Sequence, residues 1–429
     1  MNLNSIYNKL KGDKLISDSV WSILGSVLGY GLSLISGVIL ARCMGDTVYG
    51  EFGMVKQMLI YMCIVATFGM GITGTRFIAD ADVEKDLSSK MIAALLISTL
   101  FSLFLAIPLF IFSSQIASFL GSRSFLMPLK ITSLALIFCG SYTTGTGLLS
   151  GLKEFKQITL IKIIYGFMML IGCVLLYCIL GLNGAVWGLA VCYFIVTVFC
   201  LIVIHRRASL LKFDTNEVQK VAKKMLLFSI PVVLHEAIYG VMNWLLMLII
   251  AKMTDYSQLG LYTAAAIWGS TIMFIPTALR SVALSHLSSS QSDETSHYRI
   301  LNRLIIITSV SVAVPMIIII LCSGFIQSLY GPSYDGLSQV ISVTCLSCIF
   351  NAVIFILTQE LTSKGNNWSI FISRFIGNCC AILLTFVLIE YFNQKGAISA
   401  SWACLFSAVI MALSLFIYKY VVIKHFKSR

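Results

Sequence analysis

Five polar or charged side chains in or beside long apolar stretches are the candidates for binding chemistry: Lys56, Arg76, Glu236, Asn243 and Arg280. A charged side chain at the centre of a bilayer costs about 3 kcal/mol, so such residues usually face a cavity or a partner. Glu236 lies in the second helical turn after Pro231, where a carboxylate has no easy exit to water, and Asn243 continues the same helical face. We therefore expect a polar cavity at Glu236.

The cationic candidates leave two interpretations open. Lys56, Arg76 and Arg280, together with Arg374, lie near the expected ends of apolar runs. A long cationic side chain in such a position can extend to the interface and anchor its helix there. The alternative is that these cations line the polar cavity.

Enzyme motifs are absent from the sequence. It contains no phosphate-binding P-loop, no HExxH, no GxSxG and no EF-hand. The 13 Cys lie mostly inside apolar runs, where Cys acts as a small hydrophobic residue. We expect no enzymatic activity, no cofactor, no metal and no disulfide.

The elements that position these residues follow from the composition. Hydrophobic residues make up 58% of the 429 residues and charged residues 11%, with a mean hydropathy of +0.93. Average soluble domains carry roughly 25% charged residues. The chain could not cover its own surface in water, which excludes soluble enzymes, nucleic-acid binders and disordered proteins.

Twelve apolar runs are long enough to cross a membrane, which takes about 20 residues in a helix. Strand-like alternation is absent, so the pattern predicts an all-α polytopic membrane protein with twelve transmembrane helices. The expected runs are 19–41, 52–75, 90–112, 129–149, 158–180, 184–205, 225–250, 260–281, 302–323, 336–358, 368–390 and 397–420.

The basic residues predict the orientation. If the N-terminus is cytoplasmic, 24 of the 30 Lys and Arg fall on the cytoplasmic side, as the positive-inside rule describes. Both termini and the loop 206–224 are then cytoplasmic. This distribution also accounts for the net charge of +12 without a polyanion partner.

An internal repeat has a period near 210 residues. Ala41-Arg42, Gly50 and Phe52 match Ala251-Lys252, Gly260 and Tyr262 at this offset, and four further matches occur in the same order at offsets of 207 to 212. Chance matches at helix ends are the alternative. We expect two six-helix lobes, 1–210 and 211–429, related by an axis along the membrane normal.

Four segments resemble a known family. They are Ala41–Gly45 followed by Tyr49–Phe52, Phe68–Gly71 through Thr75–Ala79, Ser150–Phe155, and Gly181–Ala185. They are similar to loops and helix ends of Wzx-type polysaccharide flippases, in the multidrug/oligosaccharidyl-lipid/polysaccharide exporter superfamily. The resemblance covers essentially the whole chain.

The resemblance implies a MATE-like two-lobe fold in the bacterial inner membrane. It also implies flipping of an undecaprenyl-diphosphate-linked oligosaccharide, for O-antigen and lipopolysaccharide biosynthesis, to the periplasmic leaflet. In that family helices 1, 2, 7 and 8 line the cavity, which by position places Lys56, Arg76, Glu236, Asn243 and Arg280 there. The implied partners are the lipid-linked substrate, membrane lipids, a polysaccharide polymerase and a chain-length regulator, but no nucleic acid. An acidic Glu236 also fits a proton- or cation-coupled step.

Two other functions remain open at this point. The first is a cation-coupled multidrug antiporter of the same superfamily. The second is a membrane enzyme such as a glycan polymerase, although those proteins usually have a large outer loop and the longest one here spans roughly 113–129.

Overall fold

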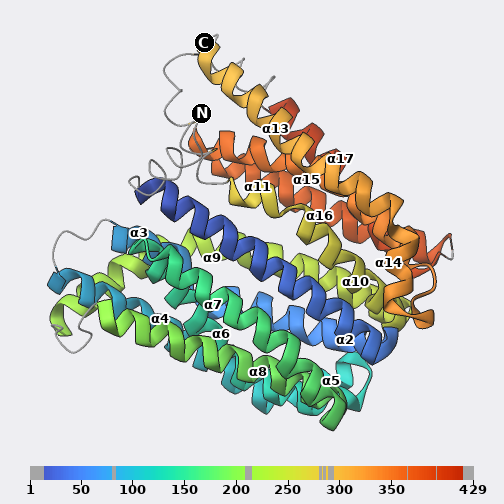
Figure 1. Cartoon of the computed structure of the whole chain (residues 1–429), viewed down its shortest axis with the longest axis horizontal. Helices are drawn as coiled ribbons and strands as arrows, with labels where there is room; N and C mark the ends of the chain where they lie inside the picture. Colours follow the sequence, from blue (N-terminus) through green and yellow to red (C-terminus); the bar gives the residue numbers. More distant parts are fainter. Residues whose placement is uncertain are drawn as a thin grey trace, which may run out of the picture. The chain divides into compact units, whose positions relative to one another are not determined.

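The computed structural model describes residues 14–79, 84–207, 215–279, 283, 287, 294–364, 366–392 and 394–418. In these ranges every regular element is a helix (Figure 1). The first part of the chain holds α2 (Lys14–Ala66), α3 (Met70–Ala79), α4 (Glu84–Ile111), α5 (Ser113–Leu120), η1 (Arg123–Phe125), α6 (Leu126–Gly151), α7 (Phe155–Met168), η2 (Met169–Cys173) and α8 (Val174–Arg207). The second part holds α9 (Thr215–Met253), α10 (Tyr256–Ile272), α11 (Phe274–Ala278), α13 (Glu294–Leu321), α14 (Ser323–Tyr330), η3 (Pro332–Tyr334), α15 (Leu337–Ser363), α16 (Asn367–Glu390) and α17 (Gly396–Ile417).

Within the described ranges, nine spans are long and apolar enough to cross a membrane. Two of them, Val27–Ala66 and Phe155–Arg206, each contain two of the expected runs. The runs are separated at single glycines, Gly45 with φ 74° and Gly181 with φ 61°. Only glycine adopts such a backbone without strain, and it lets one helix end and the next begin with almost no loop. The nine spans thus hold eleven of the twelve expected runs, and the twelve-helix count stays a prediction.

The chain forms two compact units. Unit 1 comprises residues 1–36 and 55–240, and unit 2 comprises residues 37–54 and 241–429. Helices α2 and α9 therefore each contribute residues to both units. The expected lobes 1–210 and 211–429 concern an internal repeat rather than these compact units, and that division stays a prediction.

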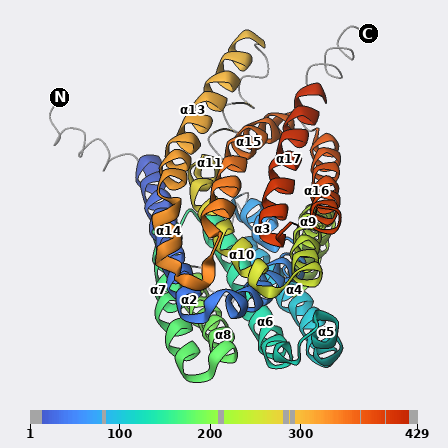
Figure 2. The same cartoon turned by 90° about the vertical axis from the view of Figure 1, so that its right-hand side faces the viewer.

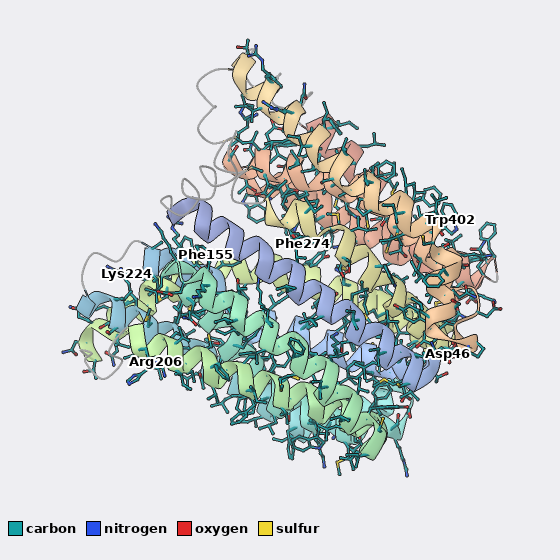
Figure 3. The ribbon with its side chains drawn as sticks, in the orientation of Figure 1. Asp46, Phe155, Arg206, Lys224, Phe274 and Trp402 are labelled. Atoms are coloured by element: carbon teal, nitrogen blue, oxygen red, sulfur yellow. The ribbon has the colours of Figure 1, made fainter. Side chains whose placement is uncertain are left out.

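Helix α6 is central to unit 1. It packs against α3, α4 and α8 (Figure 1), and its Leu129, Leu136 and Leu148 are fully buried. Arg206 and Lys224 lie toward the same end of the unit as Phe155 (Figure 3). Basic residues that the charge pattern places on one side of the membrane thus lie at one end of this helix bundle.

Helix α15 is central to unit 2. Figure 2 shows it between α13 and α17, and it packs against both as well as against α10. Its Leu357 and Leu361 join Ala408 and Leu415 of α17 in one apolar cluster. Because lipid tails are as apolar as these side chains, van der Waals packing of this kind, and not removal of apolar surface from water, holds the helices that carry the polar residues described below.

Glycines allow two helices of unit 2 to approach closely. A Cβ added to Gly50 of α2 would collide with the carbonyl oxygen of Tyr256 at the start of α10. The hydroxyl of Ser257, the next residue, donates a hydrogen bond to the Asp46 carboxylate. Contact between helix backbones at this distance requires small residues on the facing surfaces.

Candidate functional site

The structure places the five predicted residues in different parts of the chain. Lys56, Arg76 and Glu236 belong to unit 1 and Asn243 belongs to unit 2. Arg280 lies outside the described residues. Lys56, Arg76 and Glu236 come from α2, α3 and α9, and contacts within unit 1 link α9 to both α2 and α3.

Helices α3 and α9 share a polar and aromatic contact. The hydroxyls of Thr73 and Ser229, both buried, are 2.6 Å apart and hydrogen-bonded. One turn along α3, the guanidinium carbon of Arg76 lies 4.6 Å from the centroid of the Phe228 ring. Phe77 meets the same ring edge-on, with the centroids 5.9 Å apart.

The Arg76 side chain is exposed although it rests on an aromatic ring. A guanidinium over a ring is held by a cation–π attraction worth roughly 0.5–1 kcal/mol at an exposed site. Its N–H groups at the ring edge stay available, and their planar fork matches the oxygens of a phosphate or carboxylate. Arg76 is therefore positioned by Phe228 and open to an anion.

Glu236 lies two helical turns after Ser229, so it continues the face of α9 that contacts α3. Its side chain is half-buried. One further turn along, Gly240 faces α2: a Cβ there would lie 3.2 Å from the Tyr61 side chain. Along this face, α9 contacts α3 at Ser229 and α2 at Gly240. Glu236 lies between these two positions.

Lys56 of α2 is half-buried in unit 1. Its side chain lies near Cys173 of η2 and Cys192 of α8. Cys192 also lies near Tyr165 of α7. Lys56 therefore faces the interior of the unit rather than only its rim.

Three tyrosines form a cluster in the same interior. The rings of Tyr142, Tyr165 and Tyr193 lie with centroids 5.5 to 6.1 Å apart, and they come from α6, α7 and α8. The Tyr165 hydroxyl donates to the Tyr193 hydroxyl over 3.5 Å. Such a cluster offers flat apolar faces together with hydroxyls that can donate or accept.

The sequence did carry a signal for this cluster. Tyr142 lies nine residues before the end of α6 and Tyr165 ten residues after the start of α7, and the connection between these helices is short. Residues at equal distance from a tight helical hairpin lie at equal depth. This relationship makes the proximity of Tyr142 and Tyr165 readable from the sequence, although neither residue is among the predicted site residues.

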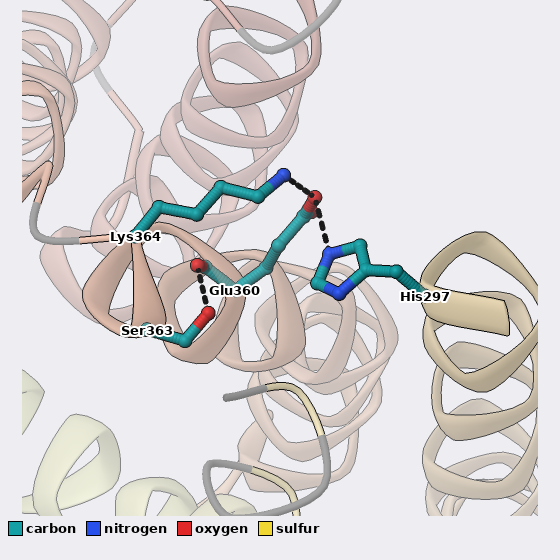
Figure 4. A network of polar contacts seen from close by, with 4 residues as sticks. All are labelled: His297, Glu360, Ser363 and Lys364. Atoms are coloured by element: carbon teal, nitrogen blue, oxygen red, sulfur yellow. Dashed lines mark hydrogen bonds and ion pairs between the residues drawn. The ribbon is translucent and has the colours of Figure 1, made fainter. Parts of the chain in front are cut away.

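A buried charge cluster in unit 2 was also missed (Figure 4). The Glu360 side chain of α15 is fully buried, and its Oε1 accepts a hydrogen bond from Lys364 Nζ at 2.8 Å. His297 of α13 places Nε2 at 3.4 Å from the same oxygen. Lys364 follows Glu360 by one helical turn, which was readable from the sequence, but the packing of α13 against α15 was not.

This cluster joins two helices through charge. Isolating a carboxylate from water costs several kcal/mol, which nearby cations and hydrogen bonds must offset. The Lys364 side chain keeps 26% of its surface exposed, whereas His297 keeps 5%. The lysine can therefore reach solvent while the imidazole stays between the helices, and both partners contact the same carboxylate oxygen, Oε1.

The helices and their buried polar groups define an all-α, multi-pass membrane protein. The chain belongs to the polysaccharide biosynthesis protein family, whose family model matches residues 39–336. No curated protein matches the chain.

Solved structures share this fold. An inward-facing multidrug resistance transporter of the MATE family in the MOP superfamily has a TM-score of 0.79 at 11% identity, over 94% of this chain and 96% of that chain. The lipid II flippase MurJ in an inward closed conformation has a TM-score of 0.72 at 18% identity, over 94% of this chain and 87% of that chain. A MOP superfamily transporter from Pyrococcus furiosus has a TM-score of 0.67 at 13% identity, over 97% and 98%.

At these identities the likeness establishes the fold. The expected MATE-like, all-α architecture is confirmed, and so is the expected family resemblance. The roles of the five predicted residues are not tested by these comparisons.

Proposed function

We propose that the protein is a flippase for an undecaprenyl-diphosphate-linked oligosaccharide. It would move this lipid from the cytoplasmic to the periplasmic leaflet of the bacterial inner membrane by alternating access. The family match over residues 39–336 is the observation that carries the proposal. The shared fold with a structure described as a lipid II flippase supports it.

The charged candidates have distinct roles in this proposal. A diphosphate crosses a low-dielectric interior far more easily when fixed cations replace part of its hydration. Arg76 and Arg280 would flank the inward mouth of the cavity, and Lys56 would act farther along α2. Their guanidinium and ammonium groups suit phosphate oxygens.

Glu236 and Asn243 would act at the cavity between the cationic groups. A half-buried carboxylate can take up a proton or a cation and so change the local charge. Such a change at Glu236 would favour release of the diphosphate, and the Asn243 amide would supply hydrogen bonds to the glycan or the phosphates.

The location and partners of the protein follow from this function. The excess of basic residues in one set of loops favours cytoplasmic termini in an inner membrane. The flipped lipid would pass to a polysaccharide polymerase and a chain-length regulator. The product would be a surface polysaccharide such as O-antigen.

A second candidate is a cation-coupled multidrug antiporter. One observation favours it: a multidrug resistance transporter of the MATE family shares the fold over 94% of this chain. The family match over residues 39–336 favours the flippase.

Deletion of the gene distinguishes the two candidates. For a flippase, surface polysaccharide is lost, lipid-linked repeat units accumulate on the cytoplasmic side, and drug susceptibility is unchanged. For an antiporter, surface polysaccharide is intact and susceptibility to cationic drugs rises. Intact polysaccharide without accumulation would overturn the flippase proposal.

A further inference from the structure

A large apolar hollow lies on unit 1, and none of the charged residues of the proposed cavity lines it. It has a volume of about 710 Å³, is open to one side and is lined by residues of α4, α6 and α8. Ligand-binding pockets usually measure about 300–1,000 Å³. The volume of the hollow therefore lies in the range of ligand-binding sites.

The lining is almost entirely hydrocarbon. It includes Ile107 and Phe110 of α4, Met127 and Leu134 of α6, and Leu180 of α8. Ile107, Phe110 and Met127 are each more than half exposed in the protein alone. Because an unfilled apolar void forfeits the dispersion contacts of its walls, a hydrocarbon chain is the occupant that these walls favour.

Polar groups also border the hollow, and the charged group among them is a cation, Lys130. Lys130 and Asn183 belong to the lining, together with Trp187. The Lys130 ammonium lies 5.5 Å from the centroid of the Phe110 ring. Among the described residues that line the hollow there is no Asp or Glu. An occupant with a negative headgroup is therefore complementary to this site.

The position of Lys130 strengthens this argument. It is one of only six basic residues that the charge pattern assigns to the outer side of the membrane. A topology signal does not explain a cation there, because positive-inside bias acts against it. Trp187 is a residue type that favours the level of lipid headgroups.

We propose that this hollow binds an anionic glycerophospholipid. An acyl chain lies along the walls formed by α4, α6 and α8, and the headgroup phosphate pairs with the Lys130 ammonium. The Asn183 amide and the Trp187 indole N–H are further donors for headgroup oxygens. None of the proposed diphosphate residues lines the hollow, so the lipid proposal does not depend on the flippase proposal.

Trp187 provides a reporter within the site itself. In a variant that keeps Trp187 as its only tryptophan, the other five (Trp21, Trp244, Trp268, Trp368 and Trp402) become Phe. The full chain is placed in phosphatidylcholine vesicles that contain increasing fractions of a lipid with brominated acyl chains. Bromine quenches tryptophan fluorescence only at short range, so quenching reports occupancy of the hollow.

We expect brominated phosphatidylglycerol to reach half-maximal quenching at about a fivefold lower fraction than brominated phosphatidylcholine, the ratio that one interfacial cation supplies. Lys130→Gln removes this difference and Lys130→Arg retains it. Lys395→Gln, which removes an outer cation outside the hollow, also retains it. Quenching by brominated phosphatidylcholine serves in every variant as the check that the hollow is intact.

Three outcomes would overturn the proposal. Equal quenching by both lipids in the parent protein would remove the headgroup preference. Absence of quenching by either lipid would mean that no acyl chain enters the hollow. Relief of quenching by undecaprenyl phosphate at fractions far below that of phosphatidylglycerol would assign the hollow to a polyprenyl chain instead. Native mass spectrometry of the unsubstituted protein checks retention of phosphatidylglycerol independently of the tryptophan replacements.

Discussion

Gly50 and Gly260 occupy equivalent positions in one reciprocal helix contact. A Cβ on Gly50 would collide with the carbonyl oxygen of Tyr256, and a Cβ on Gly260 would collide with the carbonyl oxygen of Asp46. Asp46 and Tyr256 are also 210 residues apart, as Gly50 and Gly260 are. Each contact therefore joins a glycine of one repeat to the residue of the other repeat that is equivalent to the glycine's own neighbour four positions earlier. A two-fold axis produces this pattern, in which each patch contacts its own copy. The pairing supports the proposed duplication.

Alanine at either glycine is expected to destabilise the protein to a similar degree. Each added methyl meets backbone rather than a movable side chain, and overpacking of this kind typically costs about 1–3 kcal/mol. Because both methyl groups push apart the same two helices, the double variant should lose less than the sum of the single losses. Thermal unfolding in detergent measures the effect.

Gly324→Ala is the matched control for the two glycines. Gly324 lies in α14, and nothing lies within 4 Å of a Cβ added there. The melting temperature of the Gly324→Ala protein should therefore stay the same or rise slightly. Gly50→Ala and Gly260→Ala variants as stable as Gly324→Ala would contradict the close contact.

Replacing Glu360 by Gln should reduce stability by about 2–3 kcal/mol, somewhat less than breaking a fully buried ion pair, because Lys364 can turn to solvent. A double-mutant cycle with Lys364→Met should show coupling between the two side chains.

The exposed pair of Glu217 and Lys220, at 2.9 Å on α9, serves as control. Glu217→Gln should change stability very little, since exposed pairs contribute little. Equal effects at Glu360 and Glu217 would show that burial does not matter here.

Neutralising Arg76 should impair flipping without lowering the amount of protein in the membrane. Arg76→Lys should keep part of the activity, because the charge remains while the planar fork is lost. Phe228→Leu should keep most of it, because the ring only positions the guanidinium. Polysaccharide at the cell surface is the readout.

Arg206→Ala, a neutral change elsewhere among the inner basic residues, is the control. Full activity of an Arg76→Ala, Arg280→Ala double variant would reject a cationic cavity mouth.

Cysteines at positions 73 and 229 should lock α3 to α9. The native hydroxyls of Thr73 and Ser229 are hydrogen-bonded at 2.6 Å, so a Thr73→Cys, Ser229→Cys pair is suitably placed for a disulfide. In a background without the 13 native Cys, oxidation should stop flipping if these helices separate during alternating access, and reduction should restore it. Undiminished activity of the fully cross-linked protein would mean that this contact persists throughout the cycle.

Reporter fusions test the orientation. Fusions after residues 215 and 429 should both report a cytoplasmic location, since 24 of 30 basic residues lie on that side of the twelve-helix arrangement. Periplasmic phosphatase activity at either position would exclude this topology.

The fold class could be predicted because hydropathy alone selects membrane helices. The expected runs leave connections at 42–51 and 181–183, whereas in the structure helix continues on both sides of a single residue with positive φ, Gly45 in the first and Gly181 in the second. That detail depends on how the two flanking helices pack. The run expected at 260–281 forms α10, which ends at Ile272 and is followed by the short α11.

The candidate site was less predictable from the sequence. Arg76 could be recognised from the sequence as a cation near a helix end. Its cation–π contact with Phe228 could not, because the two residues are about 150 positions apart in the chain. Glu360 was visible only as a residue at a helix end, because burial by α13 is a tertiary property. Local sequence patterns report which side chains are unusual in a membrane, whereas their partners depend on helix packing.

The two helices shared between the compact units bear on the order in which the chain can fold during synthesis. Unit 1 includes residues as late as 240, and unit 2 includes residues as early as 37. The ribosome must therefore pass about the first two thirds of α9, to residue 240, before unit 1 can close its core. The hairpin around Gly45 must wait much longer, inserted but without its contacts to α10, until residues beyond 256 emerge. During that interval the chain would expose to lipid the helix surface around Gly50 that later packs against α10.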